Sequence, residues 1–257
     1  MKKKSVKKPV YISFGTQKGG AGKSSFTILT ASLLHYKLGY NVAVIDCDYP
    51  QYSLADMRTR DLAQVPKSEW LKGVVYNQYT TNNKKMYPIV GAPVTEAMEA
   101  AERLEAELSS AYDFIFFDLP GTVNQDGALS LIAQMNYLFC PLKGKSLDTS
   151  STAQFMLTIQ ESLIKKGIGN IKAIHAFWNS VDAREKTPIY GKFSGFCAKN
   201  GISLLETKIP YLVRFGREVS DKDEVFISTI LPTSTGLLRG SNVACLVEEI
   251  LGKIGGE

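Results

Sequence analysis

The sequence predicts an α/β fold in which a mostly parallel, twisted β-sheet carries helices on both faces. Two observations predict it. Short apolar runs rich in β-branched and aromatic residues recur along the chain, and stretches with the apolar spacing of helices separate them. With 257 residues, of which 44% are hydrophobic and 21% charged, the chain has the composition of an ordinary globular protein with a sizeable core.

Six apolar runs are predicted to be strands of this sheet. Because the runs are continuously apolar rather than alternating, we expect each strand to be buried on both faces. Turn residues bound each run and set the approximate limits. In chain order the predicted strands span residues 10–14, 41–47, 114–118, 137–142, 171–178 and 203–209.

Helices are predicted to connect the strands. The first, over residues 23–39, places Phe26, Leu29 and Leu33 on one face and ends at Gly39, a residue that favours the backbone conformation of a helix C-terminus. The other predicted helices span residues 53–63, 95–111, 148–167 and 241–255. Residues 60–93 are expected to contain one helix and one edge strand, without assigned limits. The alternation of strands and helices predicts a single domain over residues 9–257.

Charge and cysteine content narrow the functional classes. The net charge of +5 permits contact with nucleic acid or anionic lipid but requires neither. Part of the excess lies in residues 1–8, MKKKSVKK, which we expect to be a basic flexible tail. No apolar run approaches the roughly 18 residues of a membrane span, and no signal peptide is expected. The four cysteines match no zinc-site spacing, so we expect a reduced, cytoplasmic protein.

A glycine-rich segment, SFGTQKGGAGKSSF at residues 13–26, joins the first predicted strand to the first predicted helix. This order of elements is the context of a phosphate-binding loop, so the sequence predicts a P-loop NTPase. Glycines allow backbone N–H groups to cradle phosphate oxygens, and a helix N-terminus favours negative charge. Lys23 is predicted to reach the β- and γ-phosphates, and the Ser24 hydroxyl to bind Mg²⁺. The predicted nucleotide-binding loop comprises Gly19, Gly20, Ala21, Gly22, Lys23, Ser24 and Ser25.

The loop departs from the plain pattern G-x-x-x-x-G-K-[ST], because Gln17 stands where the first glycine would be. The segment KGGAGKSS, which begins at Lys18, resembles the deviant Walker A motif KGGxGK[ST] of the ParA/MinD superfamily of ATPases. The resemblance implies that Lys18 crosses a dimer interface and contacts the phosphates of the ATP bound to the partner subunit. A cation placed there neutralises developing charge, as an arginine finger does. The alternative is a solvent-exposed lysine in a polar loop.

Acidic residues follow the second predicted strand, at the end of the strand where a hydrolytic nucleotide site needs them. The segment DCDYPQ is similar to the DxDPQ motif of the same superfamily, with Tyr49 inserted before Pro50. The resemblance places Asp46 near the water shell of Mg²⁺ and Asp48 beside the attacking water. The alternative is that the two carboxylates cap the helix that follows.

Another aspartate ends the strand FIFFD, at position 118. With the residues that follow, this strand resembles the Walker B segment of the superfamily. The resemblance implies that Asp118 binds Mg²⁺ through water, and that Pro120 and Gly121 begin the loop that senses the γ-phosphate. ATP and Mg²⁺ are therefore the expected cofactors. The alternative is a strand-end aspartate beside a turn.

The C-terminal half of the chain carries shorter similarities to the superfamily. Asn179 and Pro210 match positions that meet the adenine, while a strand-end asparagine is also a common turn former. Arg214, Arg217 and Arg239 are expected to bind non-specific DNA through its phosphates, with Arg214 at the position of a DNA-contacting arginine in related partition proteins. The alternative is that all three are ordinary surface arginines.

The resemblance favours the ParA branch of the superfamily. It implies an ATPase that forms a homodimer on binding ATP, hydrolyses slowly until an adaptor protein stimulates it, and partitions or positions DNA or a large complex. The C-terminal segment carries Glu248, Glu249 and Glu257 against Lys253, which favours docking on the core over insertion into anionic lipid. The scattered cysteines disfavour a metal-cluster carrier, and the absence of a C-terminal tyrosine cluster disfavours a tyrosine-kinase branch.

The DCDYPQ variant is also similar to the TraA-type ParA homologues of conjugative transposons. This similarity adds transfer of a mobile element to the expected roles. Two alternatives stay open: a nucleotide-binding regulator or scaffold of a conjugative element with little turnover, and a MinD-like positioning ATPase. The expected location is the cytoplasm, in association with the nucleoid if the protein binds DNA.

Overall fold

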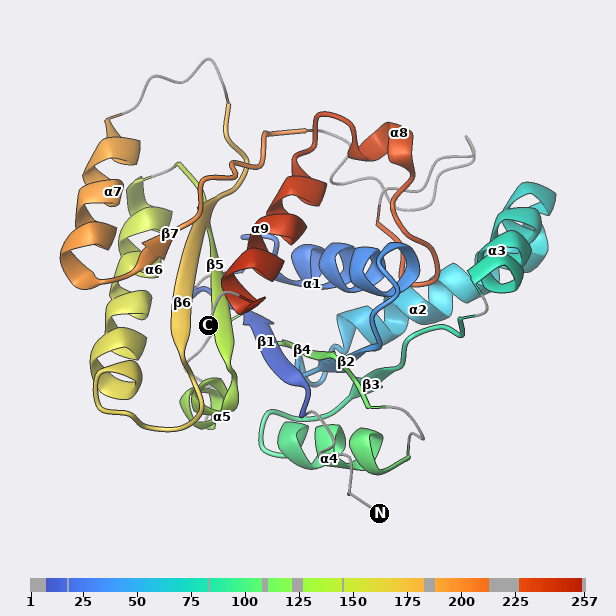
Figure 1. The fold of residues 1–257 in the computed structure, drawn as a ribbon, viewed down its shortest axis with the longest axis horizontal. Coiled ribbons are helices and arrows are strands. Elements are labelled where there is room, and N and C mark those ends of the chain that lie inside the picture. Colours follow the sequence, from blue (N-terminus) through green and yellow to red (C-terminus); the bar gives the residue numbers. More distant parts are fainter. Residues whose placement is uncertain are drawn as a thin grey trace.

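Seven parallel strands form one sheet in the part of the chain that the structure describes. The structure is a computed structural model, and it describes residues 8–17, 19–82, 84–107, 111–121, 127–144, 146–182, 188–212 and 227–255. The strands lie in the order β3-β2-β4-β1-β5-β6-β7 (Figure 1). Their bounds are β1 Val10–Phe14, β2 Val42–Asp46, β3 Ile89–Gly91, β4 Phe114–Asp118, β5 Tyr137–Leu142, β6 Ala173–Trp178 and β7 Ser203–Leu204. The predicted α/β fold with a parallel sheet is therefore confirmed.

The register of the central strands brings several chain segments to one edge of the sheet. Strand β1 pairs with β4 on one side and β5 on the other, and β2 pairs with β4. Phe14 and Asp46 both lie opposite Asp118, so β1, β2 and β4 end at the same level. Ligands of open α/β sheets bind outside the carboxyl ends of the strands, where the strand order reverses. The order reverses around β1, so the loop after β1 occupies that position.

Helices cover both faces of the sheet (Figure 1). Helices α4, α5, α6 and α7 pack on one face, and α1, α9 and the first turn of α2 pack on the other. The helical segments are α1 Lys23–Ser32 with the π-helical turn η1 Leu33–Lys37, α2 Ser53–Gln64, the 3₁₀ turn η2 Val65–Lys67, α3 Glu69–Asn82, α4 Ala97–Glu107, α5 Ala128–Gln134, α6 Ser146–Ile159 with the π-helical turn η3 Gln160–Ile164, α7 Ile189–Asn200, α8 Thr235–Leu238 and α9 Val243–Gly255.

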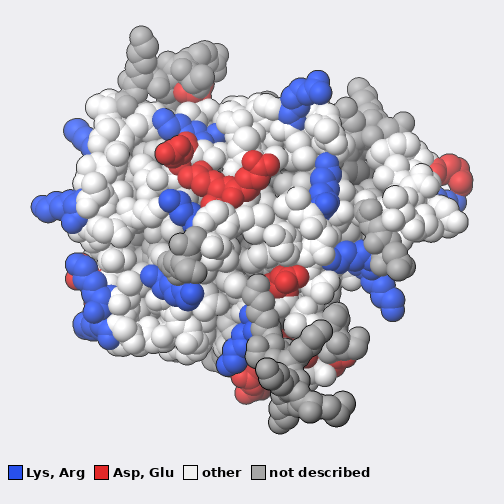
Figure 2. All heavy atoms as spheres, viewed as in Figure 1, with Lys and Arg blue, Asp and Glu red and all other residues white. Residues whose placement is uncertain are grey.

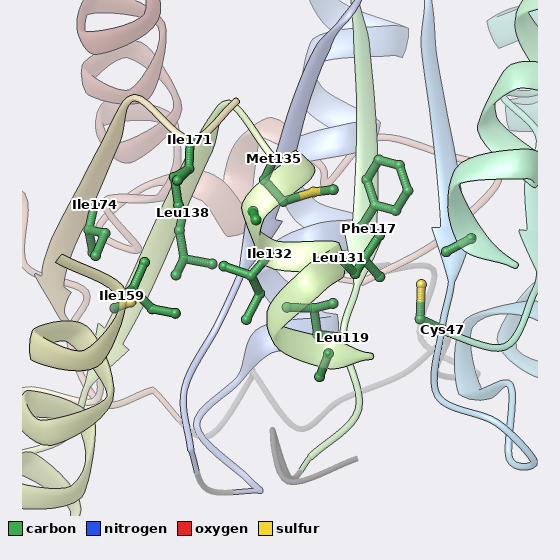
Figure 3. Packing of buried hydrophobic residues seen from close by; sticks show 14 of the residues in the cluster. Cys47, Phe117, Leu119, Leu131, Ile132, Met135, Leu138, Ile159, Ile171 and Ile174 are labelled. Carbon is green, nitrogen blue, oxygen red and sulfur yellow. The ribbon is translucent and has the colours of Figure 1, made fainter. Parts of the chain in front are cut away.

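A large apolar cluster fills the layer between the sheet and α5. Leu131 and Ile132 of α5, with Met135 just beyond it, pack among side chains of β4 and β5 (Figure 3). Phe117 and Leu138, which face them from the two strands, are fully buried. Burying a side chain of this size contributes about 1.5–3 kcal/mol, so this layer holds β4 and β5 in place behind the site.

A cluster of phenylalanines fastens α1 to the centre of the sheet. The ring of Phe14, the last residue of β1, lies 5.8 Å from the ring of Phe26 in α1. It lies 5.9 Å from Phe139 and 6.2 Å from Phe177, on the strands to one side. Because Phe14 and Phe26 flank the loop between β1 and α1, their packing fixes both ends of that loop.

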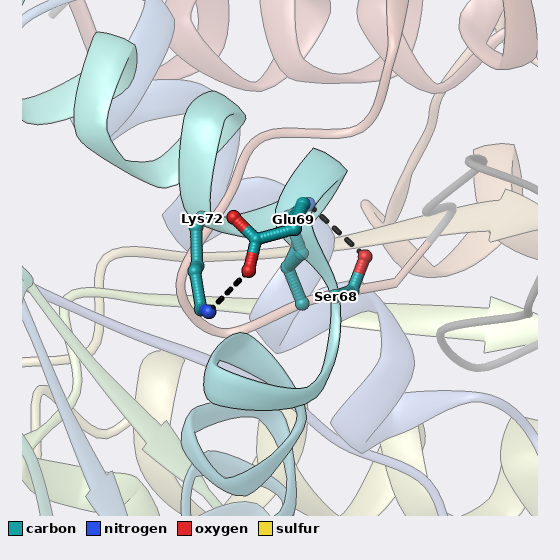
Figure 4. A network of polar contacts seen from close by, with 4 residues as sticks. Ser68, Glu69 and Lys72 are labelled. Carbon is teal, nitrogen blue, oxygen red and sulfur yellow. Dashed lines mark hydrogen bonds and ion pairs between the residues drawn. The ribbon is translucent and has the colours of Figure 1, made fainter.

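Residues 60–93 contain the expected helix and edge strand, α3 and β3. Helix α3 begins after Ser68, whose Oγ accepts a hydrogen bond from the N–H of Leu71 at 3.2 Å (Figure 4). An exposed ion pair joins Lys72 to Glu69 at 2.6 Å in the same turn. Such a pair contributes at most about 1 kcal/mol, so the burial of Leu71 in a small apolar cluster decides where α3 lies.

The strand expected over residues 203–209 is much shorter than predicted. Only Ser203–Leu204 (β7) pairs as a strand, and after it single hydrogen bonds to β6 continue from the N–H groups of Leu205 and Ile209. The N–H groups of Glu206 and Thr207 donate to the carboxylate of Glu249 in α9, at 2.8 and 3.0 Å. Their partner is thus a helix side chain rather than a neighbouring strand.

Three helices, α5, α7 and α8, were not predicted. Helix α5 has seven residues and α8 has four, too few for a helical period to show in the sequence. Helix α7 contains Gly191 and Gly195, and glycine disfavours helix. In α7 the burial of Phe193 and Cys197 against the sheet outweighs that preference.

Helix α9 docks on the core, as its apolar positions predicted. Val243, Leu246, Val247 and Ile250 are buried in the cluster that also holds α1. Acidic side chains gather over α9 on the outer surface (Figure 2). Within the described ranges, the structure has no helix of the length and apolar character needed to cross a membrane.

Helix α2 is fastened to the segment before α8. Arg58 donates to the carbonyl oxygens of Tyr87 and Thr229, both at 3.0 Å. The buried carboxylate of Asp61 accepts from the N–H and the hydroxyl of Thr229 at 2.7 Å and from the hydroxyl of Ser228 at 3.2 Å. Helix α2 and residues 228–229 therefore form one packed unit.

Because His35 is buried, we expect the folded protein to lose stability at acid pH. Burial lowers the pKa of His35 to about 4, and the nearby charges of Lys84 and Arg58 act in the same direction, against an interaction with the carbonyl oxygen of Lys85. Between pH 6.5 and 4 the unfolded chain binds this proton and the folded protein does not. The free energy of unfolding therefore falls as the pH falls through that range, by on the order of 3 kcal/mol.

The variant His35→Gln cannot bind that proton, so its stability is expected to fall less over the same range. Urea unfolding of both proteins at several pH values between 4 and 7.5 measures the difference. The shapes of the two pH profiles are compared, so a uniformly lower stability of the variant does not affect the result. Parallel profiles would show that His35 is not the responsible group.

Candidate functional site

The loop between β1 and α1 has the backbone shape that its glycines predicted. Gly20 and Gly22 have φ values of 73° and 96°, a region that side chains disfavour. A Cβ on Gly15 would lie 2.7 Å from Cδ1 of Leu138, so the loop leaves β1 in close contact with β5. Helix α1 begins at Lys23, and its N-terminus faces the carboxyl edge of the sheet. Free N–H groups at a helix N-terminus form a ready site for an anion.

Lys23 is the buried cation of this loop, with only 6% of the residue exposed. Burial lowers the pKa of Lys23, and the carboxylates of Asp118 and Asp48 oppose that shift. The loop, β4 and the segment after β2 therefore meet at this ammonium group.

Asp118 is fully buried at the end of β4. Its Oδ1 accepts a hydrogen bond from the hydroxyl of Thr27 at 3.3 Å. Burial raises the pKa of Asp118 to about 7, and Asp46 acts in the same direction, whereas hydrogen bonds from Ser24 and Thr27 and the charge of Lys23 oppose it. A carboxyl group this costly to ionise, at the carboxyl end of a central strand, makes this position a candidate functional site.

The other oxygen of Asp118, Oδ2, has no hydrogen-bond partner among the described residues. An unpaired buried acceptor beside the hydroxyl of Ser24 fits Mg²⁺ or one of its water ligands. The described residues contain no group of three acidic, histidine or cysteine side chains that could hold a metal by themselves. A cation here would therefore also need Ser24, water and phosphate oxygens as ligands.

Asp46 caps helix α2. Its Oδ2 accepts hydrogen bonds from the N–H groups of Leu54 at 2.8 Å and Ala55 at 3.1 Å, and its Oδ1 accepts one from Asp48 at 3.3 Å. The capping alternative is thus observed for Asp46. Among the described hydrogen bonds the carboxylate of Asp48 makes no such cap, and this residue is only half-buried. The role of Asp46 in the water shell of Mg²⁺ stays a prediction.

The inserted residue, Tyr49, is 55% exposed and stands above Tyr52, with ring centres 5.7 Å apart. The insertion is accommodated on the surface, while Asp46 and Asp48 stay at the end of β2. Across the site, the backbone of Gly121 lies beside Gly19: a Cβ built on Gly121 would be 3.8 Å from the Cα of Gly19. The segment after β4 therefore lies against the loop, and its role in sensing the γ-phosphate stays a prediction.

Asn179, at the end of β6, donates from Nδ2 to the carbonyl oxygen of Ala21 at 2.9 Å. Pro210 lies next to it, in a bridge with Val181. A cavity of about 350 Å³ opens between this region and the loop, and its lining residues include Gly20, Gly22, Ser25, Phe26, Leu29, Lys143, Asn179, Ser180, Tyr211 and Leu212.

Several residues of the site were not predicted, among them Thr27, Lys143 and Tyr211. Thr27 lies one helical turn after Lys23, and Lys143 directly follows β5, so their positions in the elements could have indicated them. Tyr211, 65% exposed, lines the cavity only because residues 209–211 pair with the chain after β6. That pairing joins segments far apart in the sequence.

Four further predicted residues are accounted for separately. Lys18, Arg214 and Arg217 fall outside the described residues. Arg239 is exposed at the C-terminus of α8. On the face shown in Figure 2, Lys and Arg side chains are spread out rather than gathered in one stripe. A larger cavity of about 570 Å³ lies between α6 and α7 and contains none of the predicted site residues.

Solved structures with this fold come from several kinds of protein. A plasmid partition protein of Borrelia burgdorferi B31 bound to AMPPNP is 17% identical, with a TM-score of 0.57, and covers 96% of this chain and 100% of its own. MinD of Aquifex aeolicus, in complex with MinC, is 12% identical with a TM-score of 0.59 and covers 98% and 97%. Cobyrinic acid a,c-diamide synthase of Mycobacterium smegmatis, with ADP and magnesium, is 19% identical with a TM-score of 0.54 and covers 81% and 89%.

These likenesses establish the fold, and the sequence establishes the family. No curated protein sequence matches the chain. The model of the MipZ ATPase family matches residues 10–154, which carry the glycine-rich loop, Asp46, Asp48 and Asp118. The chain therefore belongs to the MipZ family of ATPases, which agrees with the resemblance of its loop to the ParA/MinD superfamily.

Proposed function

We propose that the protein is an ATPase that dimerises on binding ATP and acts in the partition, positioning or transfer of DNA or a mobile element. The observation that carries the proposal is the buried Asp118 carboxyl group, which has an unpaired oxygen and lies beside Ser24, Thr27 and Lys23. A phosphate–metal complex is the ligand that this combination suits. It brings a cation to Asp118 and an anion to Lys23 and the N-terminus of α1.

The loop and α1 bind the phosphates in this proposal. The N–H groups of residues 19–24 and the ammonium group of Lys23 hold the β- and γ-phosphates. Ser24, and Asp118 through water, would hold Mg²⁺, which when bound neutralises charge on the transferred phosphate. Two solved structures with this fold contain bound nucleotide: AMPPNP in the plasmid partition protein, and ADP with magnesium in the cobyrinic acid a,c-diamide synthase. They support the same cofactors for this protein.

Asp48 is the proposed partner of the attacking water. The carboxylate of Asp46 already accepts hydrogen bonds from three backbone N–H groups, so Asp46 is less available than Asp48 as a proton acceptor. Asp48 is half-buried, and its charge acts on the buried ammonium of Lys23, which supports its proximity to the reacting phosphate. Asp48 would orient the water and accept its proton.

The cavity beside the loop is the proposed site of the base. Asn179 and Ser180 offer polar groups along its wall, and Tyr211 offers an aromatic ring. Pro210, the residue before Tyr211, forms a β-bridge with Val181, and this bridge holds residues 210–211 beside the chain that follows β6. A mostly apolar cavity with a few polar groups suits a purine.

Lys18 is the proposed link between two copies of the chain. In the superfamily that the loop resembles, this lysine contacts the ATP of the partner subunit, so ATP would hold the dimer together and hydrolysis would release it. The dimer would then bind non-specific DNA through Arg214, Arg217 and Arg239, and an adaptor protein would stimulate the slow turnover. Relatives of the same fold named as a partition protein and as MinD support a role of this kind.

The hydrolytic role of the site is tested with Asp118→Asn. The variant keeps the shape of the side chain and removes its charge, so Mg²⁺-dependent ATP hydrolysis is expected to fall at least about 100-fold. Phosphate release measured with and without DNA is the readout. The matched control is Asp56→Asn, an exposed aspartate in the first turn of α2, which should hydrolyse like the original protein.

If Asp118→Asn hydrolyses ATP at the original rate, the site is not the one proposed. If the original protein binds ATP but releases no phosphate under any of these conditions, it is a nucleotide-dependent regulator or scaffold with little turnover. That second outcome would reject the enzymatic part of the proposal and keep its binding part.

The dimer is tested with Lys18→Ala. ATP with Mg²⁺ should double the mass of the original protein in light-scattering chromatography, and ADP should not. The variant should bind mant-ATP with similar affinity and stay monomeric, because its own nucleotide keeps all its contacts. Lys165→Ala, an exposed lysine paired only with Glu161 in the described contacts, is the control and should dimerise. Dimerisation of Lys18→Ala at the original ATP concentration would reject the role of Lys18 across the interface.

A further inference from the structure

Two side chains donate hydrogen bonds to carbonyl oxygens of the phosphate loop. The ammonium group of Lys143 donates a hydrogen bond to the carbonyl oxygen of Gly20. The side-chain amide of Asn179 donates to the next carbonyl oxygen, that of Ala21, at 2.9 Å. Consecutive carbonyl groups of the loop are thus bound by donors from two neighbouring strands.

Both donors stand on well-fixed backbone. Lys143 directly follows β5 and Asn179 directly follows β6, and these strands pair up to Leu142 and Trp178. The N–H of Asn179 donates to the carbonyl oxygen of Leu142 at 2.7 Å. The carbonyl oxygen of Lys143 itself accepts from the hydroxyl of Thr149 at 2.8 Å. The backbone positions of Lys143 and Asn179 are therefore fixed relative to each other at the carboxyl end of the sheet.

The planarity of the peptide bond gives these contacts a consequence for phosphate binding. In a trans peptide the carbonyl group and the following N–H point in opposite directions. A carbonyl of Gly20 turned toward Lys143 therefore turns the N–H of Ala21 away from it, and the carbonyl of Ala21 held by Asn179 does the same for the N–H of Gly22. Gly20 and Gly22 have positive φ values, and the orientation of these peptide groups depends on that backbone conformation.

We infer that Lys143 is a positioning residue of the phosphate loop: by holding the Gly20 carbonyl, it keeps the loop N–H groups aimed at a phosphate before any nucleotide is bound. The inference rests on the proposed function, since it assumes that the loop binds a nucleotide. Lys143 also lines the cavity beside the loop, so the same side chain adjoins the proposed base site. Pre-organised donors bind an anion more tightly because less ordering is needed on binding.

The test compares Lys143→Met, which keeps most of the length of the side chain and removes its charge, with Lys143→Arg, which restores a cationic donor. Lys165→Met is the control for loss of a surface lysine, since Lys165 pairs with Glu161 on an exposed turn. The first readout needs no nucleotide. Amide hydrogen exchange of the peptide covering residues 15–30 should become about fivefold faster in Lys143→Met, while Lys143→Arg and the control match the original protein.

The second readout is affinity for mant-ADP and for a non-hydrolysable ATP analogue. Loss of the charged hydrogen bond should weaken both by about tenfold, since the loop N–H groups serve both nucleotides. Weakening of the ATP analogue alone, with unchanged exchange in the nucleotide-free loop, would place Lys143 on the terminal phosphate and overturn the inference. Unchanged exchange and unchanged affinities would also overturn it.

These outcomes separate the inference from the function it rests on. If the original protein binds neither nucleotide, the proposed function fails, whatever the variants do. If the original protein binds both nucleotides and Lys143→Met behaves like Lys165→Met, the function stands and the role of Lys143 is rejected. Thermal unfolding of each variant confirms that it is folded, and Lys143→Gln replaces Lys143→Met if the latter is not.

Discussion

The buried carboxyl group of Asp118 is the interaction on which the site depends. It lies at the end of a central strand, where the hydroxyl of Thr27 reaches one oxygen and the other has no partner among the described residues. Its pKa near 7 reflects burial that Lys23 and two hydroxyl groups offset only in part. The proposed function gives this carboxyl group a cation, and it gives the buried ammonium group of Lys23, 6% exposed, an anion.

The rest of the fold serves to keep these groups in register. Phenylalanine packing around Phe14 fixes the two ends of the loop, and the apolar layer under α5 fixes β4 and β5. Asp46 ties the start of α2 to the end of β2, and Arg58 and Asp61 tie its body to residues 228–229.

Much of the fold could be predicted because the signals were local. Continuous apolar runs marked the strands, and the glycine-rich segment between a strand and a helix marked the loop. The elements that the sequence did not predict correctly depend on contacts with distant parts of the chain. Helix α7 contains two glycines and forms because the sheet buries Phe193 and Cys197. The strand after residue 204 ends early because Glu249, more than 40 residues later, takes the N–H groups of Glu206 and Thr207.

The sequence by itself determined the chemistry: the lysines, the serine and the aspartates of the loop and strand ends, and the family that they indicate. Only the tertiary structure decided how those groups are used. It made Asp46 a helix cap and left Asp48 free of that task, because the start of α2 folds back onto the end of β2. It brought Lys143 and Asn179 to the loop carbonyls, because β5 and β6 end side by side. Contacts between segments more than 100 residues apart have no local pattern: the positions of Lys143 and Asn179 after strands could mark them as site residues, but not show which carbonyl oxygens they bind.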